Sequence, residues 1–121
     1  MPDGSLAGRD IVVAGASGGL GSATVALLEA EGARVTAGYR TRATGGARGV
    51  QADLTVAEDR RKLLDAAPAL YGLVVLAGDP ARVKESGELE AAMERSFQVN
   101  CEGPVLLARE AAGRMRDTRT P

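Results

Sequence analysis

A glycine-rich segment gives the strongest chemical signal in the sequence. Four of the seven residues from 15 to 21 are glycine, in the order Gly-Ala-Ser-Gly-Gly-Leu-Gly. The segment follows a short apolar run at residues 11–14 and precedes a helical pattern, so its amides lie at the N-terminus of a helix. Helix amides and the helix dipole attract anions, and glycine lets a phosphate approach the backbone. The segment therefore predicts a nucleotide-binding loop, with a purely structural turn as the alternative.

The remaining composition excludes several kinds of site. The 121 residues contain no histidine and one cysteine, which excludes a histidine proton shuttle, Ser-His-Asp catalysis and a cysteine-based zinc cluster. Lys and Arg number 15 against 16 Asp and Glu, and this net charge of −1 argues against a nucleic-acid partner. Residues 1–8 lack the features of a signal peptide, and no apolar run is long enough to span a bilayer. We therefore expect a cytoplasmic protein with no metal site and no membrane partner.

Alternating strand and helix patterns must position the glycine loop. Apolar or β-branched runs predict strands at residues 11–14, 34–39, 50–52 and 70–76. Helical patterns follow the first, third and fourth of these runs. Strands that alternate with helices form parallel βαβ units with right-handed crossovers. The sequence thus predicts a doubly wound α/β fold, organised as a single domain over residues 1–121.

Each helical pattern predicts a particular buried face. The first helix is expected to end at Gly32 and to bury one face: Leu20, Thr24, Leu27 and Leu28. The second is expected to begin at a capping box in which Thr55 is the N-cap and Glu58 its partner. The third carries a stripe at three- and four-residue steps: Leu89, Met93, Phe97, Cys101, Val105, Ala108, Ala112 and Met115. Cys101 is accordingly expected to be a buried apolar residue rather than a nucleophile.

Four motifs, in order, resemble the short-chain dehydrogenase/reductase family. Residues 14–21 are similar to the family's Thr-Gly-x-x-x-Gly-x-Gly fingerprint, with Ala14 in place of Thr. Asp53 follows the third predicted strand, where the family has an Asp that contacts adenine. Residues 75–78, Val-Leu-Ala-Gly, occupy the place of the family's Asn-Asn-Ala-Gly, and residues 97–104 resemble the helix that bears its catalytic Asn.

The resemblance implies the N-terminal, NAD(P)-binding Rossmann portion of that family. Its four strands would stand in the order 3-2-1-4 with flanking helices, and the C-terminal half of the family fold would be missing. The implied activity is hydride transfer between a nicotinamide and a carbonyl or alcohol substrate, with Asn100 as a catalytic residue. The implied cofactor-binding residues are Gly15, Ser17, Gly18, Gly19, Leu20, Gly21, Arg40, Asp53, Leu54, Ala77 and Gly78.

The family's catalytic Tyr-x-x-x-Lys motif, with its preceding Ser, does not occur in the 121 residues. Tyr39 and Tyr71 are followed four residues later by Ala43 and Val75. The resemblance implies that the motif lies beyond the last helix, where the Tyr acts as general acid and base and the Lys lowers its pKa. We therefore expect a truncated member whose chain alone has little or no reductase activity. The alternatives are a catalytically inactive NADP(H)-binding module, a decayed or truncated pseudoenzyme, and a fold that binds nothing.

The end of the second predicted strand indicates which cofactor is preferred. A carboxylate there binds the ribose 2′-hydroxyl of NAD, yet no acidic residue occurs between Glu31 and Asp53. Arg40, together with Arg42, can pair with the 2′-phosphate of NADP. The sequence therefore favours NADP(H) over NAD(H), the alternative being that these arginines are solvated loop charges.

The sequence of the last helix predicts an irregularity near Pro104. Pro104 has no amide hydrogen to bond the Asn100 carbonyl, so the helix is expected to kink there and leave that carbonyl free, either for the active site or only for packing.

The fourth strand would be an open apolar edge, and the last helix would lack the elements on which it normally packs. We therefore expect a homo-oligomer formed through the last helix and the exposed sheet edge.

Overall fold

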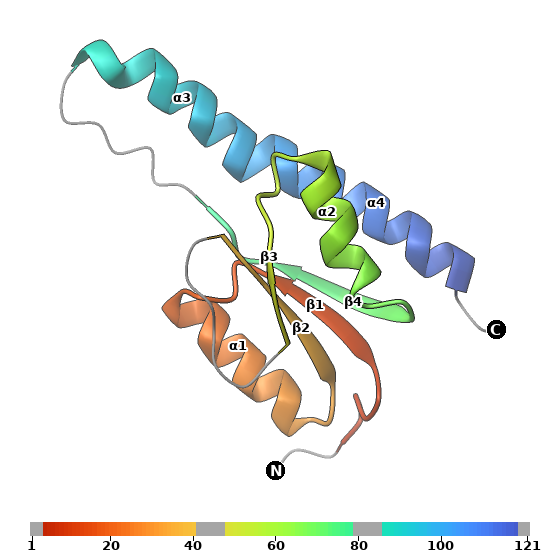
Figure 1. The fold of residues 1–121 in the computed structure, drawn as a ribbon. Helices are drawn as coiled ribbons and strands as arrows, with labels where there is room; N and C mark the ends of the chain where they lie inside the picture. The colour runs from red at the N-terminus through yellow and green to blue at the C-terminus, as the bar shows by residue number, and fades with distance from the viewer. Residues whose placement is uncertain (1–3, 41–47, 79–85, 119–121) are drawn as a thin grey trace.

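The computed structural model describes residues 4–40, 48–78 and 86–118, and four parallel strands form its central sheet (Figure 1). The strands stand in the order β3-β2-β1-β4. Their bounds are β1 Asp10–Ala14, β2 Arg34–Tyr39, β3 Arg48–Gln51 and β4 Leu70–Val75. The predicted strand order is confirmed, and the predicted strand ends lie within about two residues of those observed, as is usual for element boundaries.

The strand register brings the carboxyl ends of three strands together. Ala14, the last residue of β1, pairs with Gly38 of β2 and with Val75 of β4. The Leu76 amide extends this pairing by donating to the Ala14 carbonyl at 2.8 Å. From β1 the chain adds β2 and then β3 on one side, and it then returns to place β4 on the other side of β1. The strand order therefore reverses beside β1. Open parallel sheets bind ligands at such a reversal point.

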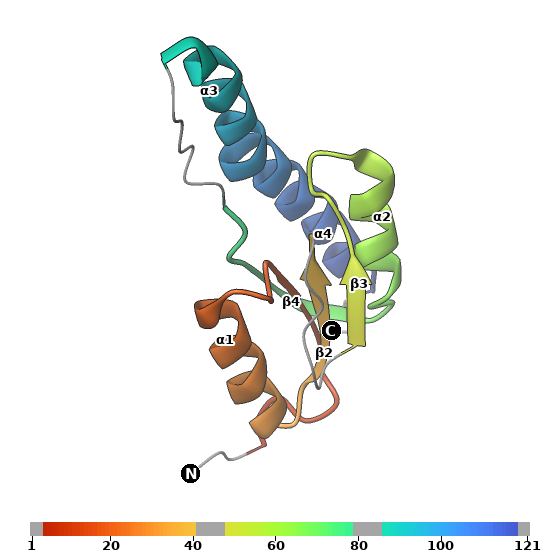
Figure 2. The ribbon, with the colours of Figure 1, turned by 60° about the vertical axis from the view of Figure 1, so that its left-hand side comes forward.

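Helices cover both faces of the sheet, as a doubly wound fold requires (Figures 1 and 2). α1 (Gly19–Ala30) packs on one face, where Val25 belongs to a buried apolar cluster. α2 (Ala57–Asp65) and α4 (Gly103–Thr118) cover the other face, where Leu107 is fully buried. In the described part of the chain, every helix is too short or too polar to cross a bilayer.

The final helical segment is one long rod with a π-helical turn inside it (Figure 2). α3 (Leu89–Phe97) leads into the π-turn Gln98–Glu102, which leads into α4. The Gly103 amide donates to the carbonyl five residues earlier, at Gln98, which is the spacing of a π-helix. The irregularity predicted at Pro104 is therefore present as a π-turn rather than as a sharp kink, since a wider turn accommodates the missing amide hydrogen.

The predicted buried face of α1 is largely wrong. Leu20 and Leu27 are 70% and 64% exposed, whereas Gly21 and Val25 are buried. The reason is steric: Gly21 lies against the backbone of the preceding loop, and this contact turns its side of the helix toward the sheet. Positions four and seven residues later, Val25 and Leu28, then face the core.

The predicted stripe of the last helix faces outward rather than inward. Phe97 and Val105 are each 59% exposed, and Cys101 is also exposed, so its predicted burial is wrong. The inner face of α4 consists instead of residues at four-residue steps: Gly103, Leu107 and Ala111. Small residues on this face let the helix approach the sheet and α2 closely, while Met115 packs against the same cluster as predicted.

The predicted capping box is also absent from the described residues. The N-cap of α2 is Val56, and the Thr55 hydroxyl donates to the Asp53 carboxylate at 2.7 Å. The Asp53 amide donates to the Asp59 carboxylate at 2.9 Å. Asp53 thus accepts the Thr55 amide hydrogen bond that the sequence pattern assigned to Glu58, and Asp59 in turn holds the amide of Asp53.

Candidate functional site

Two glycines of the loop after β1 are required by close backbone packing. Gly15 has a φ of +86°, and a Cβ there would lie 2.4 Å from the Ala77 nitrogen. A Cβ on Gly21 would lie 2.3 Å from the Gly15 carbonyl oxygen. Glycine at both positions lets the loop pack against the backbone of the segment after β4 and lets α1 begin directly against the loop.

The other two glycines leave the start of α1 open. A Cβ on Gly18 or Gly19 would meet no described atom within 4 Å. Gly18 is the N-cap, and no described side chain caps the helix there. The Ser22 amide donates to the Gly18 carbonyl at 2.8 Å, and the amides before it have no acceptor within the helix. Open space bordered by helix amides suits phosphate groups, so these residues fit the diphosphate of a dinucleotide.

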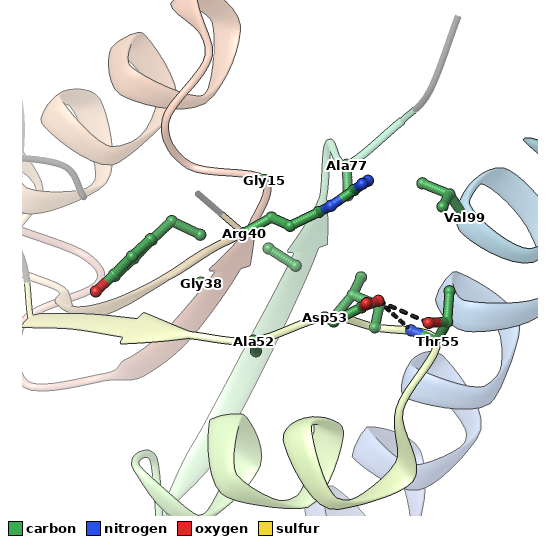
Figure 3. A pocket seen from close by; sticks show the side chains of 11 residues that line it. Gly15, Gly38, Arg40, Ala52, Asp53, Thr55, Ala77 and Val99 are labelled. Carbon is green, nitrogen blue, oxygen red and sulfur yellow. Dashed lines mark hydrogen bonds between the residues drawn. The ribbon is translucent and has the colours of Figure 1, made fainter. Parts of the chain in front are cut away.

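A shallow pocket, partly open to solvent, lies beyond the carboxyl ends of β1 and β2, and its empty space is about 410 Å³ when the open mouth is included (Figure 3). It brings together five of the predicted residues: Gly15, Arg40, Asp53, Leu54 and Ala77. Its other lining residues were not predicted as site residues: Ala14, Gly38, Tyr39, Ala52, Thr55 and Val99.

Asp53 is the acidic group of this pocket. Its Oδ1 accepts hydrogen bonds from the Thr55 hydroxyl at 2.7 Å and from the Thr55 amide at 3.0 Å. These two bonds lower the pKa of Asp53; partial burial opposes them, and the charge of Arg40 acts in the same direction as Thr55. The carboxylate is therefore ionised at neutral pH and fixed in place as a hydrogen-bond acceptor.

Arg40 is the basic group at the mouth of the pocket. Its side chain is exposed and extends across the opening toward Ala77 and Val99 (Figure 3). The Arg40 carbonyl accepts a hydrogen bond from the Gln51 side chain at 3.1 Å, which ties the end of β2 to β3. Arg42, the second predicted partner of a 2′-phosphate, lies outside the described residues.

Asn100 and Gly78 lie next to each other beside the pocket. A Cβ on Gly78 would lie 3.1 Å from the Asn100 Oδ1 atom. The side-chain nitrogen Nδ2 of Asn100 donates to the Ser96 hydroxyl at 2.9 Å. The structure thus places the predicted catalytic Asn at the opening after β4, on the π-turn that also supplies Val99 to the pocket.

The remaining predicted residues flank the pocket rather than line it. They form the loop and first turn of α1: Ser17, Gly18, Gly19, Leu20 and Gly21. The sequence contained a signal for Thr55, because an Asp two residues before a Thr often accepts that residue's hydrogen bonds. Val99 gave no comparable signal, since its place in the pocket depends on how the π-turn is oriented.

Comparisons with known proteins agree with this arrangement. The family model for short chain dehydrogenase matches residues 9–120. An uncharacterised oxidoreductase of Methylorubrum extorquens is 35% identical over an alignment of 126 positions, which covers 90% of this chain and 50% of that protein.

Two solved structures illustrate the structural likeness. A doubly substituted variant of Serratia marcescens short-chain dehydrogenase/reductase is 31% identical with a TM-score of 0.74, over 95% of this chain and 55% of that one. An NADH-dependent reductase, A1-R′, complexed with NAD, has a TM-score of 0.81 at 19% identity over the same shares, a likeness that shows the fold alone. The chain thus spans about half the length of these relatives. Because the family model covers nearly all of it, the chain belongs to the short-chain dehydrogenase family.

Proposed function

We propose that this chain binds a nicotinamide adenine dinucleotide and forms the cofactor-binding half of an oxidoreductase for carbonyl or alcohol substrates. The observation that carries the proposal is the open start of α1 beside the Asp53 pocket, where the strand order reverses next to β1. Membership of the short-chain dehydrogenase family supports it. Reductase A1-R′, which is similar in fold, is itself in complex with NAD.

Each part of the site suits one part of the dinucleotide. The pocket at Asp53 and Leu54 suits the adenosine, because it combines apolar walls with an anchored carboxylate. The amides at Gly18 and Gly19 suit the phosphates. When bound, the nicotinamide supplies the hydride exchanged with the substrate, and Asn100 is the catalytic residue that this chain contributes at that end.

The same site favours NADP(H) over NAD(H). Arg40 stands at the pocket mouth after β2, and the nearest acidic residue in the pocket, Asp53, is already engaged by Thr55. A guanidinium at this place pairs with a 2′-phosphate, whereas no carboxylate at the end of β2 is available for a 2′-hydroxyl. Calorimetric titration with NADPH and with NADH compares the two affinities directly.

A binding module without turnover is the second candidate function. The sequence has two tyrosines, and neither is followed by Lys at the fourth position, so this chain offers no match to the family's general acid. We propose that the chain alone binds the dinucleotide but does not turn over. Oxidation of NADPH in the presence of simple aldehydes and ketones, followed at the absorbance of the reduced cofactor, would contradict this.

Self-association is proposed from the outward stripe and the sheet edge at β4. Phe97 and Val105 are exposed on the long rod, and β4 ends the sheet in the described part of the chain. We expect light scattering to give a mass above the 12.4 kDa of one chain. A clean monomer at tens of micromolar would contradict this proposal alone.

A paired substitution tests dinucleotide binding. Gly19→Asp places a carboxylate at the start of α1, where there is room for it and where it stabilises the helix. It repels phosphates, so NADPH affinity should fall by more than about tenfold, since like charges brought together cost several kcal/mol. Gly87→Asp adds the same charge at another open glycine, away from the pocket, and should bind like the unsubstituted chain. Equal binding by both variants would reject the proposed site.

A further inference from the structure

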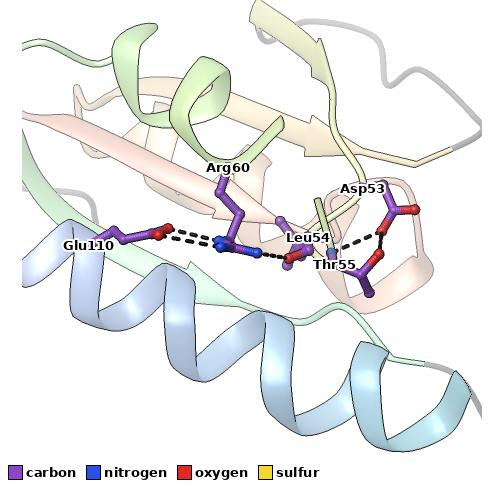
Figure 4. A network of polar contacts seen from close by, with 5 residues as sticks. All are labelled: Asp53, Leu54, Thr55, Arg60 and Glu110. Carbon is purple, nitrogen blue, oxygen red and sulfur yellow. Dashed lines mark hydrogen bonds and ion pairs between the residues drawn. The ribbon is translucent and has the colours of Figure 1, made fainter. Parts of the chain in front are cut away.

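Arg60 of α2 is a buried charged side chain that the site described above does not use. It is 5% exposed and points from α2 toward α4 (Figure 4). The neighbouring arginine, Arg61, is by contrast exposed and paired with Glu58 on the same helix. Burial of a guanidinium is costly unless every donor finds a partner, so the contacts of Arg60 indicate what it does.

The Arg60 guanidinium joins three parts of the molecule. Its Nε donates to Glu110 Oε1 at 2.8 Å and its Nη2 to Glu110 Oε2 at 3.4 Å, which is a two-point contact with α4. Its Nη1 donates to the Leu54 carbonyl at 2.8 Å. Leu54 lines the adenosine pocket, so one side chain connects α2, α4 and the pocket (Figure 4).

Leu54 is held from a second side by the first residue of α4. A Cβ on Gly103 would lie 2.9 Å from the Leu54 carbonyl oxygen, so the two backbones are in contact. The same carbonyl therefore contacts both the Arg60 guanidinium and the residue that directly follows the π-turn of Asn100. A shift of Leu54 toward α4 is blocked by Gly103, and a shift away from α2 breaks the hydrogen bond from Arg60.

Only the arginine of this pair is buried, since the Glu110 side chain is 40% exposed. The cost of removing a guanidinium from water offsets much of what such a pair adds to stability, which suggests a role in positioning. We propose that Arg60 is a positioning residue: it holds the segment at residues 53–55 against α4 and thereby keeps the nucleotide pocket in its binding form. Only the identity of the ligand rests on the proposed function. The link between Arg60 and the pocket segment can be tested without any ligand.

The test compares two double variants with the unsubstituted chain. Arg60→Met combined with Glu110→Met removes the whole pair, which avoids the buried, unpaired guanidinium that Glu110→Met alone would leave. Arg61→Met combined with Glu58→Met removes the exposed pair of the same helix by the same chemistry. Each protein is measured by urea unfolding, by hydrogen exchange of individual amides and by calorimetric titration with NADPH.

The Arg60/Glu110 variant should unfold at nearly the same urea concentration as the unsubstituted chain. The amides of Asp53, Thr55 and Val56, whose hydrogen bonds all involve Asp53, should exchange about tenfold faster, while those of β1 stay protected. NADPH affinity should fall about tenfold, because the pocket is then in its binding form for only about a tenth of the time. The Arg61/Glu58 variant should change none of the three.

Two results would overturn the proposal. In one, exchange at residues 53–56 is unchanged in the Arg60/Glu110 variant, which would mean that Leu54 is held without Arg60. In the other, the amides of β1 accelerate equally, which would mean that the pair only stabilises the fold. If the unsubstituted chain does not bind NADPH, the proposed function fails, and the exchange measurement still decides the role of Arg60.

Discussion

Leu107 is the residue on which the placement of α4 depends most directly. Its side chain is fully buried in the cluster that also contains Val12, Leu63 and Leu64, between α4, α2 and the sheet. Leu107→Ala removes buried carbons and leaves a cavity that neighbours on three elements cannot close. Substitutions of this kind cost about 2–5 kcal/mol, and the complete enclosure points to a value of about 3 kcal/mol.

Val105→Ala is the matched control, because it shortens an apolar side chain of the same helix that is 59% exposed. Exposed substitutions usually change stability by less than about 0.5 kcal/mol. Urea unfolding followed by circular dichroism measures both. With a urea dependence of about 2 kcal/mol per molar, Leu107→Ala should lower the midpoint by about 1.5 M, and Val105→Ala should leave it nearly unchanged.

The opposite result would refute the observed orientation of α4. If Val105→Ala were the costly change and Leu107→Ala the mild one, the stripe predicted from the sequence would be the buried face after all. Unfolding should be recorded at several protein concentrations, because a loss on Val105→Ala that grows with concentration reports association through the stripe rather than packing within one chain.

Three further measurements test other parts of the structure. Hydrogen bonds from Thr55 lower the pKa of Asp53 in the folded chain. Asp53 therefore adds stability at pH values above its unfolded pKa, and this stability is lost as the pH falls through its folded pKa. Asp53→Asn should flatten the acid side of the stability profile, which urea unfolding at several pH values measures. Gly21→Ala should cost about 1–3 kcal/mol in thermal unfolding because its Cβ meets backbone, whereas Gly19→Ala, with open space around it, should not destabilise the fold. Cys101 is exposed, so it should react with a thiol reagent in the native chain nearly as fast as in urea. A much slower reaction in the native chain would mean that Cys101 is buried, as the sequence predicted.

The sheet was predictable because its signals are local. A short apolar run followed by a glycine loop and a helical pattern specifies β1 and α1 together, and the right-handed crossover rule leaves few arrangements for the following strands. The glycine-rich pattern indicated Gly15 and the family resemblance implied Asp53. The fold brings both to one pocket, because each follows a strand and the carboxyl ends of parallel strands meet.

The orientation of the helices was not predictable because periodicity marks an apolar face without saying what covers it. In α1 the contact of Gly21 with the loop decides the orientation, and this contact depends on a glycine having no side chain. In α4 the inner face is Gly103, Leu107 and Ala111, and because two of the three are small, the outward apolar stripe is the more visible pattern in the sequence. Arg60 illustrates the same limit, since its partner Glu110 is 50 positions away in the sequence.

The π-turn also determines how straight the outer surface of the long rod is. Phe97 and Val105 are eight residues apart, and two turns of α-helix take about 7.2 residues, so an uninterrupted α-helix would rotate one about 80° away from the other. The π-turn between them accommodates one more residue per turn and removes most of this drift, and the two side chains are in fact equally exposed. The extra residue thus acts as a phase correction at the junction, which keeps Phe97 at the end of α3 and Val105 near the start of α4 on the same side of the rod.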